Sequence, residues 1–461
     1  MTIKFATIVI FLVWLTAWPV YASARLDFQT VDMLTYRCYN EQKWDSVILV
    51  GKQALRQKID YYYLRVRMGI AYYEKHEYFS AAIHLEKARQ FNSGDPFVNK
   101  HLYWAYMYTN RNEEANLFEA SLPAAERDTT GSKPGFLEQV HFETGFTLSS
   151  DRAPKNLQTL MGKDSIYGEQ DLYGNSIYED LSLNLRVSNR LGFTLAYNFL
   201  NFNKTKYIQN NRGPAHLDSI ADTSFNYHMS QHEAHIAALI TLPWGLKVMP
   251  AFHWIYVSYT MINTLFRPPS GINRPPPPFT RKDTTYNNFL AALEISKDIG
   301  RFNIALSGSW SNLNGMSQEQ AGLALTYYPL GNLSFYGTTA ATGFFQSTDS
   351  RLLLSQALGG KFTSWLWGEV NFYYGDYTNA NIFNGSIVYN NSDMVDYRAG
   401  ATLNFILSRH IQLSLIYQYF RKESQQIYYT KTQDPMPKPV QQTKNNPYYT
   451  NTLIGGITWK L

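Results

Sequence analysis

The chain has 461 residues, of which 45% are hydrophobic and 16% aromatic, with 35 tyrosines, one cysteine and a formal net charge of +5. The charge is modest and spread along the chain, which excludes nucleic-acid binding through a basic block. A single cysteine, Cys38, excludes an intramolecular disulfide. No segment of the mature chain reaches the ~18 uninterrupted apolar residues of a membrane-spanning helix.

The N-terminus has the pattern of a secretory signal peptide. Lys4 precedes an apolar run over residues 5–20, and Ala22-Ser23-Ala24 supplies the small residues of a cleavage site. Charged residues follow at once, which favours cleavage over retention as an anchor. We therefore expect residues 1–24 to be removed and the mature chain to be exported.

Residues 25–125 have helical periodicity and a repeat of 34 residues. The middle unit, residues 62–93, places Gly69 and Ala81 where two helices of a hairpin must approach closely, and Leu85 fills the space around them. This unit resembles a tetratricopeptide repeat. The residues that carry the resemblance are Gly69, Tyr72, Tyr78, Ala81 and Ala88.

The resemblance implies a small repeat surface that binds a periplasmic protein partner in its concave face. A plain helical spacer is the alternative. Pro123 ends the last helix, because proline interrupts the helical ladder. We expect residues 126–135 to be a polar linker.

From residue 136 to the C-terminus, strands with period-2 alternation are joined alternately by tight turns and by long polar loops. Ser188-Asn189-Arg190 is typical of the tight turns, and the proline-rich segment Phe266–Thr285 is typical of the long loops, with Asp151–Ile177 and Lys422–Pro447 as further examples. About fourteen strands recur. Short periplasmic turns, long outward loops and an even strand number are typical of outer-membrane barrels. A secreted sandwich or propeller instead predicts connections of similar length at both ends.

We therefore predict a mixed, mainly β fold. A C-terminal transmembrane antiparallel β-barrel of about fourteen strands, residues 136–461, follows the small α-helical tetratricopeptide-like domain. The barrel is expected in the bacterial outer membrane among its lipids, with the N-terminal domain in the periplasm. Gly456, Trp459 and Leu461 resemble the C-terminal assembly signal of such barrels, which implies the barrel-assembly machinery as a partner.

Polar residues alternate with the apolar ones along these strands and are expected to face the lumen. They either form ion pairs that hold neighbouring strands together, or contact a substrate. Small residues on the same face, such as Ala305 and Ser307, could leave room for a channel. The candidates are His141, Glu143, Asp180, Arg186, Glu233, His235, Glu294, Glu369, Asp396 and Arg398.

The sequence carries no catalytic or cofactor motif, so we predict neither an enzyme nor a cofactor. His232-Glu233-Ala234-His235 resembles a metal motif only on a helix, because on a strand His232 and His235 point to opposite faces. We therefore predict no metal site.

Helical repeats followed by an outer-membrane barrel resemble the YaiO-like proteins and, more distantly, the porins that export poly-N-acetylglucosamine or cellulose. The resemblance implies transport or export of a polar substrate, with polysaccharide as one candidate, assisted by the periplasmic partner. The alternative hypothesis is a non-conducting anchor that holds the repeats against a periplasmic or surface complex. Substrate, partner and oligomeric state are left open.

Overall fold

The computed structural model describes residues 26–127, 135–151, 165–211, 220–264, 279–347, 349–390, 392–430 and 440–461. The predicted signal peptide, residues 1–24, and most of the predicted linker, residues 126–135, lie outside these ranges. The chain divides into two compact units, residues 1–105 and 106–461. Within the described ranges, no helix has the length and apolar character needed to cross a membrane.

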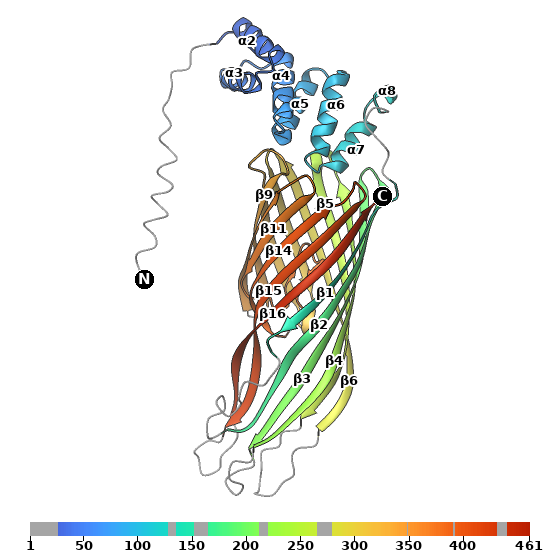
Figure 1. Ribbon diagram of the computed structural model, residues 1–461, viewed down its shortest axis with the longest axis vertical. Helices are drawn as coiled ribbons and strands as arrows, with labels where there is room; N and C mark the ends of the chain where they lie inside the picture. Colours follow the sequence, from blue (N-terminus) through green and yellow to red (C-terminus); the bar gives the residue numbers. More distant parts are fainter. Residues whose placement is uncertain are drawn as a thin grey trace, which may run out of the picture. The chain divides into compact units, whose positions relative to one another are not determined.

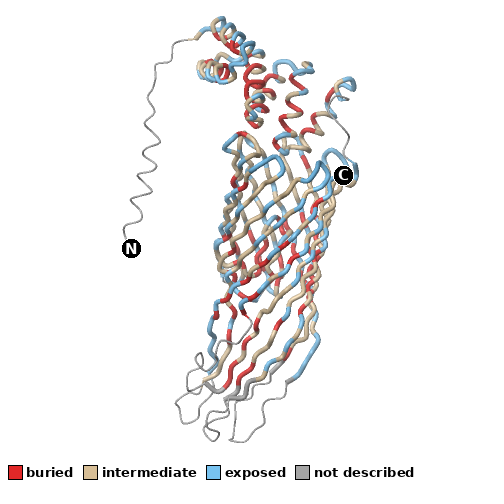
Figure 2. Tube along the Cα trace, in the orientation of Figure 1, coloured by how far each residue is buried: buried red, intermediate tan, exposed pale blue. Residues whose placement is uncertain are grey.

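Antiparallel helices that bury small and apolar residues form the first unit (Figure 2). Helix α6 crosses the boundary between the units, and α7 and α8 belong to the second. The helices in the described residues are α2 (Phe28–Asn40), α3 (Trp44–Arg56), α4 (Tyr62–Glu74), α5 (Tyr78–Phe91), α6 (Pro96–Met107), α7 (Asn112–Ala120) and α8 (Ala124–Arg127).

Helices α4 and α5 pack at the close approach that the sequence predicts. A Cβ atom at Gly69 would lie 2.7 Å from Leu85 Cδ2, and Ala81 and Ala88 are completely buried. Tyr72 is also buried. The helical hairpin is therefore present, whereas its assignment to the tetratricopeptide family stays a prediction.

The strands of the second unit close into a barrel (Figure 1). Fourteen antiparallel strands form the wall in the order β1-β16-β15-β14-β11-β10-β9-β8-β7-β6-β5-β4-β3-β2, which confirms the predicted architecture. The wall strands are β1 (Leu137–Ser149), β2 (Ser165–Ser188), β3 (Leu191–Asn211), β4 (Ile220–Thr241), β5 (Leu246–Thr264), β6 (Phe279–Ile299), β7 (Phe302–Ser311), β8 (Gln318–Tyr327), β9 (Phe335–Gln346), β10 (Asp349–Lys361), β11 (Leu366–Tyr374), β14 (Met394–Ile406), β15 (Ile411–Thr430) and β16 (Val440–Lys460).

The wall has two heights. Strand β2 has 24 residues, more than twice the ~10 residues that cross a membrane, and β3 to β6, β15 and β16 are similarly long. Strands β7 to β11 and β14 have 9 to 13 residues. The long strands project beyond the short ones on the side opposite to the tight turns (Figure 1).

The projecting strands make a second closure of their own. Beyond the end of β14, the free edge of β15 pairs with β2, from Gln426↔Gln170 to Thr430↔Ser165. The other edge of β15 stays paired with β16 up to Thr430↔Val440. Strand β2 thus takes the place beside β15 that β14 occupies nearer the tight turns.

Parts of the predicted long loops are strands. Residues 165–177, 279–285, 422–430 and 440–447 all belong to paired strands, so the assignment of these parts to loops is wrong. Outside the lipid both faces of a strand meet water, and the apolar–polar alternation that identifies a strand disappears there. The connection between β9 and β10, residues 347 and 348, is short although it lies on the long-loop side.

Apolar side chains cover the outward face of the wall. Leu306, Leu323 and Leu453 are each more than half exposed, at 58%, 52% and 55%, while their neighbours along each strand point inward. Trp459 of the last strand and Leu461 just after it are exposed, as is Leu453. Gly456 lies on the inward face, because a Cβ atom there would lie 2.9 Å from Glu143 Cγ and would clash with Ser414 Oγ.

Candidate functional site in the barrel lumen

The connection between β11 and β14 folds into the barrel. We call residues 375–393 the lumen loop; residue 391 within it lies outside the described ranges. It contains a two-stranded sheet of its own, β12 (Asn381–Ile382) and β13 (Ile387–Val388), which is separate from the wall. The turn between these strands is Phe383-Asn384-Gly385-Ser386, in which Asn384 and Gly385 have φ values of 53° and 81°. Asn-Gly is the sequence that tight hairpins favour, because both residues adopt positive φ readily.

The loop reaches the wall opposite to β11 and β14, the two strands that it connects. Its tip accepts a hydrogen bond from His253 Nδ1 at Gly385 O (2.7 Å), and Asn384 Nδ2 donates to Met249 O (2.7 Å). Both partners lie on β5. In the closed order of fourteen strands, β5 is six steps from β11 and seven from β14, so the loop spans the full width of the lumen.

Hydrogen bonds to the side walls hold the middle of the loop. Asn381 Nδ2 donates to Ser309 Oγ (2.9 Å), and Asn381 exchanges two backbone hydrogen bonds with the Gln320 side chain (3.0 and 3.1 Å). Asn390 Nδ2 donates to Asn288 Oδ1 (3.1 Å). These contacts join the loop to β6, β7 and β8 through polar groups only.

An arginine of the wall fixes each end of the loop. Arg351 pairs with Asp376 (2.5 Å) and donates to Thr378 O. Arg398 Nη1 donates to Tyr389 OH (2.9 Å), and its guanidinium lies over the ring of Tyr373 at 4.8 Å. Because each arginine is bound to the loop and to the wall together, the ends of the loop are the most firmly held parts of it.

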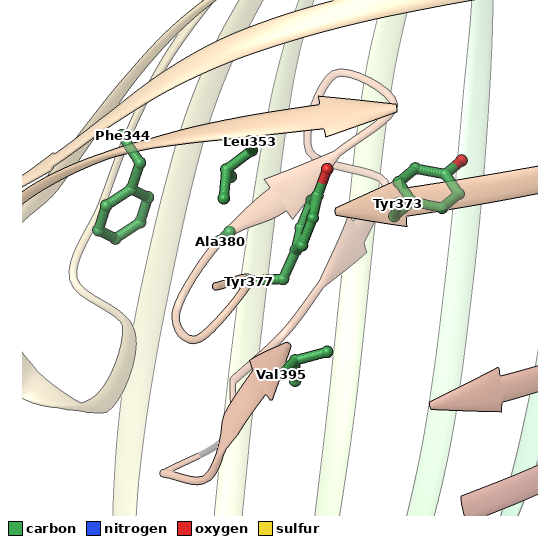
Figure 3. Close-up of a cluster of buried hydrophobic side chains, with 6 residues drawn as sticks. All are labelled: Phe344, Leu353, Tyr373, Tyr377, Ala380 and Val395. Atoms are coloured by element: carbon green, nitrogen blue, oxygen red, sulfur yellow. The ribbon is translucent and has the colours of Figure 1, made fainter. Parts of the chain in front are cut away.

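A buried cluster supports the loop from one side (Figure 3). Tyr377 and Ala380 of the loop pack against side chains of the short strands, and Tyr377 lies beside Leu353 and Tyr373. The other members are Phe344 and Val395. Apolar burial also holds the other flank of the loop, because Val388 packs against two clusters of the long strands, one around Ile255 and one around Leu290.

Glu233 and His253 form the polar centre opposite the cluster. His253 is completely buried, and its Nε2 lies 3.1 Å from Glu233 Oε2. Because Gly385 O only accepts, Nδ1 of His253 carries a proton. Glu233 also accepts from Gln231 Nε2 (2.5 Å) and Asn198 Nδ2 (3.2 Å). His235 lies edge-on to His253, with ring centroids 5.3 Å apart, and neither of its ring nitrogens has a partner among the described residues.

A cavity of about 230 Å³ lies between the lumen loop and the short strands. Glu294 of β6 and Glu369 of β11 both line it, and Tyr336 OH donates to Glu369 Oε2 (2.6 Å). The loop contributes Asn384 and Phe383. The rest of the lining is largely small side chains of β7, β8 and β9, such as Ser307, Ala324, Thr338, Ala340 and Thr342. A second depression, between β6 and β7, is lined by Leu293, Ile295, Leu306 and Trp310, and faces outward.

The structure distributes the remaining predicted lumenal residues over two further places. His141 pairs with Glu143 (3.0 Å) and contacts Thr458 Oγ1 (2.7 Å), and Asp180 lies opposite Glu143 in the strand register. Arg186 pairs with Glu138 (2.5 Å) near the tight turn between β2 and β3. These residues tie β1 to β2 and β16, and they do not contact the lumen loop.

Asp396 faces outward, not into the lumen as predicted. It lies at a β-bulge between Val395 and Tyr397, which shifts the alternation by one residue. Its carboxylate pairs with Arg421 (3.3 Å), and Arg421 lies opposite the exposed Tyr449. Asp396 therefore belongs to the outward face, whereas Arg398 lies inside.

His232 and His235 point to opposite faces of β4, as predicted. His232 Nδ1 contacts Tyr197 OH (2.7 Å), and Tyr197 is on the exposed face. His235 is buried on the inner face. In the part of the chain that the structure describes, no group of three His, Cys, Asp or Glu residues is arranged to hold a metal ion.

A closed antiparallel barrel with an apolar outer face and a polar lumen is the architecture of bacterial outer-membrane proteins. The protein is an outer-membrane β-barrel. The chain enters the barrel from the side of the tight turns, which places the preceding helical unit in the periplasm.

Solved structures that resemble the chain include a Pseudomonas aeruginosa FadL homologue (9% identity, 70% of this chain and 90% of the other, TM-score 0.41) and the TodX monoaromatic hydrocarbon channel (8%, 75% and 94%, TM-score 0.43). The KdgM porin covers 51% of this chain and 96% of its own length, at 9% identity and a TM-score of 0.27. No protein-family model and no curated protein matches the sequence.

Proposed function

We propose that the protein is an outer-membrane channel for a small polar substrate, and that the lumen loop holds it closed. The observation that carries the proposal is the course of the loop, which crosses from β11 and β14 to β5 on the opposite wall. The loop obstructs the lumen without being part of the wall. Removing it would leave the barrel ladder intact and open a path lined by polar and small side chains.

The way the loop is attached supports reversible opening. Hydrogen bonds of Asn384, Asn381 and Asn390 attach its tip and middle, and Val388 adds an apolar contact with the wall. Water can replace such partners, so each hydrogen bond contributes only about 0.5–1.5 kcal/mol net. The arginine contacts at the two ends would then add to the stability of the closed state.

The proposal also gives the helical unit a role in the periplasm. A repeat surface on the periplasmic side could bring a protein partner to the entrance of the channel. Export of a polysaccharide remains one form of this function, and it would require the lumen loop to leave the lumen completely.

Conductance of the purified protein in planar bilayers tests the channel. We expect few openings in the native protein and long, large openings when residues 379–392 are replaced by Gly-Gly-Ser-Gly. The short turn suffices because β11 and β14 are neighbours. A folded variant of this kind that never conducts would contradict the proposal.

A cross-link provides the matched control. A Cβ atom at Gly385 would lie 3.5 Å from Ala292 Cβ, within the ~3.5–4.5 Å that a disulfide requires. In a Cys38→Ala background, Gly385→Cys with Ala292→Cys should abolish openings when oxidised and restore them when reduced. The single variant Gly385→Cys controls for the strain of a side chain at this positive φ and for its clash with Leu290 Cδ2. The single variant Ala292→Cys controls for the second thiol.

A non-conducting anchor for a periplasmic or surface complex is the second candidate. Arg351, Arg398 and the cluster around Tyr377 favour it, because they hold the ends of the loop tightly. Complete absence of conductance in both the native and the loop-replaced protein would leave this as the function.

A further inference from the structure

The cavity under the lumen loop identifies the chemical class of the substrate. We propose that it binds small organic cations that carry protonated amines. The inference rests on the proposed channel function and adds to it the ligand that the lumen selects.

The charge of the cavity is negative. Glu294 and Glu369 line it, and none of the described lining residues is Lys, Arg or His. Glu294 makes no hydrogen bond or ion pair with another described side chain, and Glu369 uses one oxygen for Tyr336 OH. Arg398 is bound to Tyr389 and covered by the ring of Tyr373. The two carboxylates therefore lack a cation of the protein's own.

Asn384 closes the cavity on the side of the lumen loop. The residue is 8% exposed and lines the cavity. Its Nδ2 donates to Met249 O, which fixes the orientation of the amide, and its Oδ1 is buried. The polar groups that the cavity offers to a ligand's donors are therefore chiefly the two carboxylates.

Aromatic rings complete the chemistry. Tyr373, Tyr377 and Phe383 line the same cavity, and Phe383 is 60% exposed although it lies on a loop inside the barrel. Ring faces attract ammonium groups. At about 230 Å³ the cavity is below the ~300–1,000 Å³ of drug-sized sites, which limits the ligand to a small molecule.

Other ligand classes fit less well. An anion would meet two carboxylates and no cationic partner. A neutral polyhydroxyl compound would leave both carboxylates without a counter-charge. Glu294 and Glu369 lie on β6 and β11, with β7 to β10 between them along the wall, so an amine can approach a carboxylate from either side.

Isothermal titration of the full-length protein in detergent tests the inference. The probes are 1,4-diaminobutane and 1,4-butanediol, which have the same length and differ in carrying ammonium or hydroxyl groups. We expect the diamine to bind and the diol to bind at least about tenfold more weakly. Glu294→Gln and Glu369→Gln should each weaken diamine binding by about tenfold or more, because each removes a charge-assisted hydrogen bond. Glu319→Gln, which alters an exposed carboxylate of β8, should leave it unchanged.

The outcomes separate the ligand from the channel, because conductance is recorded on the same preparations. Equal binding of diamine and diol, or diamine binding that survives both Gln substitutions, would overturn the cation site. Absence of diamine binding in a protein that conducts would also overturn it and leave the channel standing. Diamine binding by the native protein, with no conductance from the loop-replaced variant, would support the site and reject the channel.

Discussion

Single residues in this protein act through the space that they leave or fill. Gly69 lets α4 and α5 approach until Leu85 covers its Cα, and Gly456 leaves room for Glu143 and Ser414 inside the barrel. In both places the side chain opposite is large or polar, so the glycine and its partner must be read together. Substitution at either glycine changes the packing of two elements rather than one.

His84 makes the helical unit sensitive to acid. Its ring stacks on Tyr72 (5.2 Å between centroids), and Nδ1 lies 3.0 Å from Arg65 Nη1. Burial, followed by the positive charge of Arg65, lowers the pKa of His84 to about 4, against about 6.5 in an unfolded chain. Between these values the unfolded state binds more protons, so stability is complete above about pH 6.5 and is lost as the pH falls towards 4.

Urea unfolding followed by circular dichroism at 222 nm measures this effect. From pH 7.5 to pH 4.5 we expect the free energy of unfolding of the helices in the native protein to fall by on the order of 1–3 kcal/mol, because of His84. His84→Asn should reduce the loss, whereas His76→Asn, at an exposed histidine of the same unit, should not. An unchanged pH dependence in His84→Asn would show that other groups control it.

At the scale of elements, the lumen loop depends on its fixed ends. Arg398 binds Tyr389 of the loop and lies against the rings of Tyr373 and Phe420 of the wall. Arg398→Met keeps much of the apolar contact but removes the hydrogen bond and the charge. We expect the open probability in planar bilayers to rise by about 5–30-fold, which corresponds to a loss of one to two kcal/mol from the closed state.

Arg409→Met is the matched control, because Arg409 is exposed in the turn between β14 and β15. It should leave the open probability at the native level. If Arg398→Met behaves like this control, the contacts of Arg398 do not hold the loop in the lumen.

The wall was predictable from the sequence because strand alternation is a local property. The alternation around Leu181 and Ser182 is enough to assign each side chain to a face of the strand. About fourteen such runs predicted the barrel. The bulge at Asp396 shifts the alternation by one residue. The strand extensions outside the lipid do not alternate, so they gave no such signal. The pairing of β15 with β2 joins residues more than 250 positions apart and left no local signal.

The lumen loop was missed for a similar reason. Its inward course depends on contacts such as Asn384 with Met249 and Gly385 with His253, each more than 130 positions away. A partial signal was available. Asn384-Gly385 stands between the apolar residues Ile382 and Ile387, a pattern that predicts a hairpin, and asparagine is unusually dense from residue 379 to 391. The pattern indicates a structured loop but not that it turns inward.

At the scale of the whole molecule, the barrel closes where β1 meets β16, from Gln139↔Lys460 to Ser149↔Thr450. A side chain at Gly456 would clash with Ser414 Oγ and crowd Glu143 on the inner face. At Gly455 nothing lies within 4 Å of the corresponding Cβ atom, because this position faces outward. The two adjacent glycines therefore form a natural pair for testing closure.

We expect Gly456→Val to reduce the closed barrel strongly and Gly455→Val to have little effect. Overpacking of this kind costs about 1–3 kcal/mol, and at Gly456 it acts on the pairing of β1 with β16 that closes the barrel. The measurement is the fraction of protein that migrates as a compact, heat-sensitive form in gels run without boiling. Equal fractions in the two variants would show that the inner face of β16 tolerates a side chain.

The separation of the lumen loop from the wall has an evolutionary consequence. All fourteen wall strands pair without it, and its two strands pair only with each other. Mutations within this one contiguous stretch can therefore alter what the lumen admits while the ladder that keeps the protein in the membrane is inherited unchanged. Related barrels are expected to diverge first in the segment between β11 and β14, and to acquire new selectivity there without losing the ability to assemble.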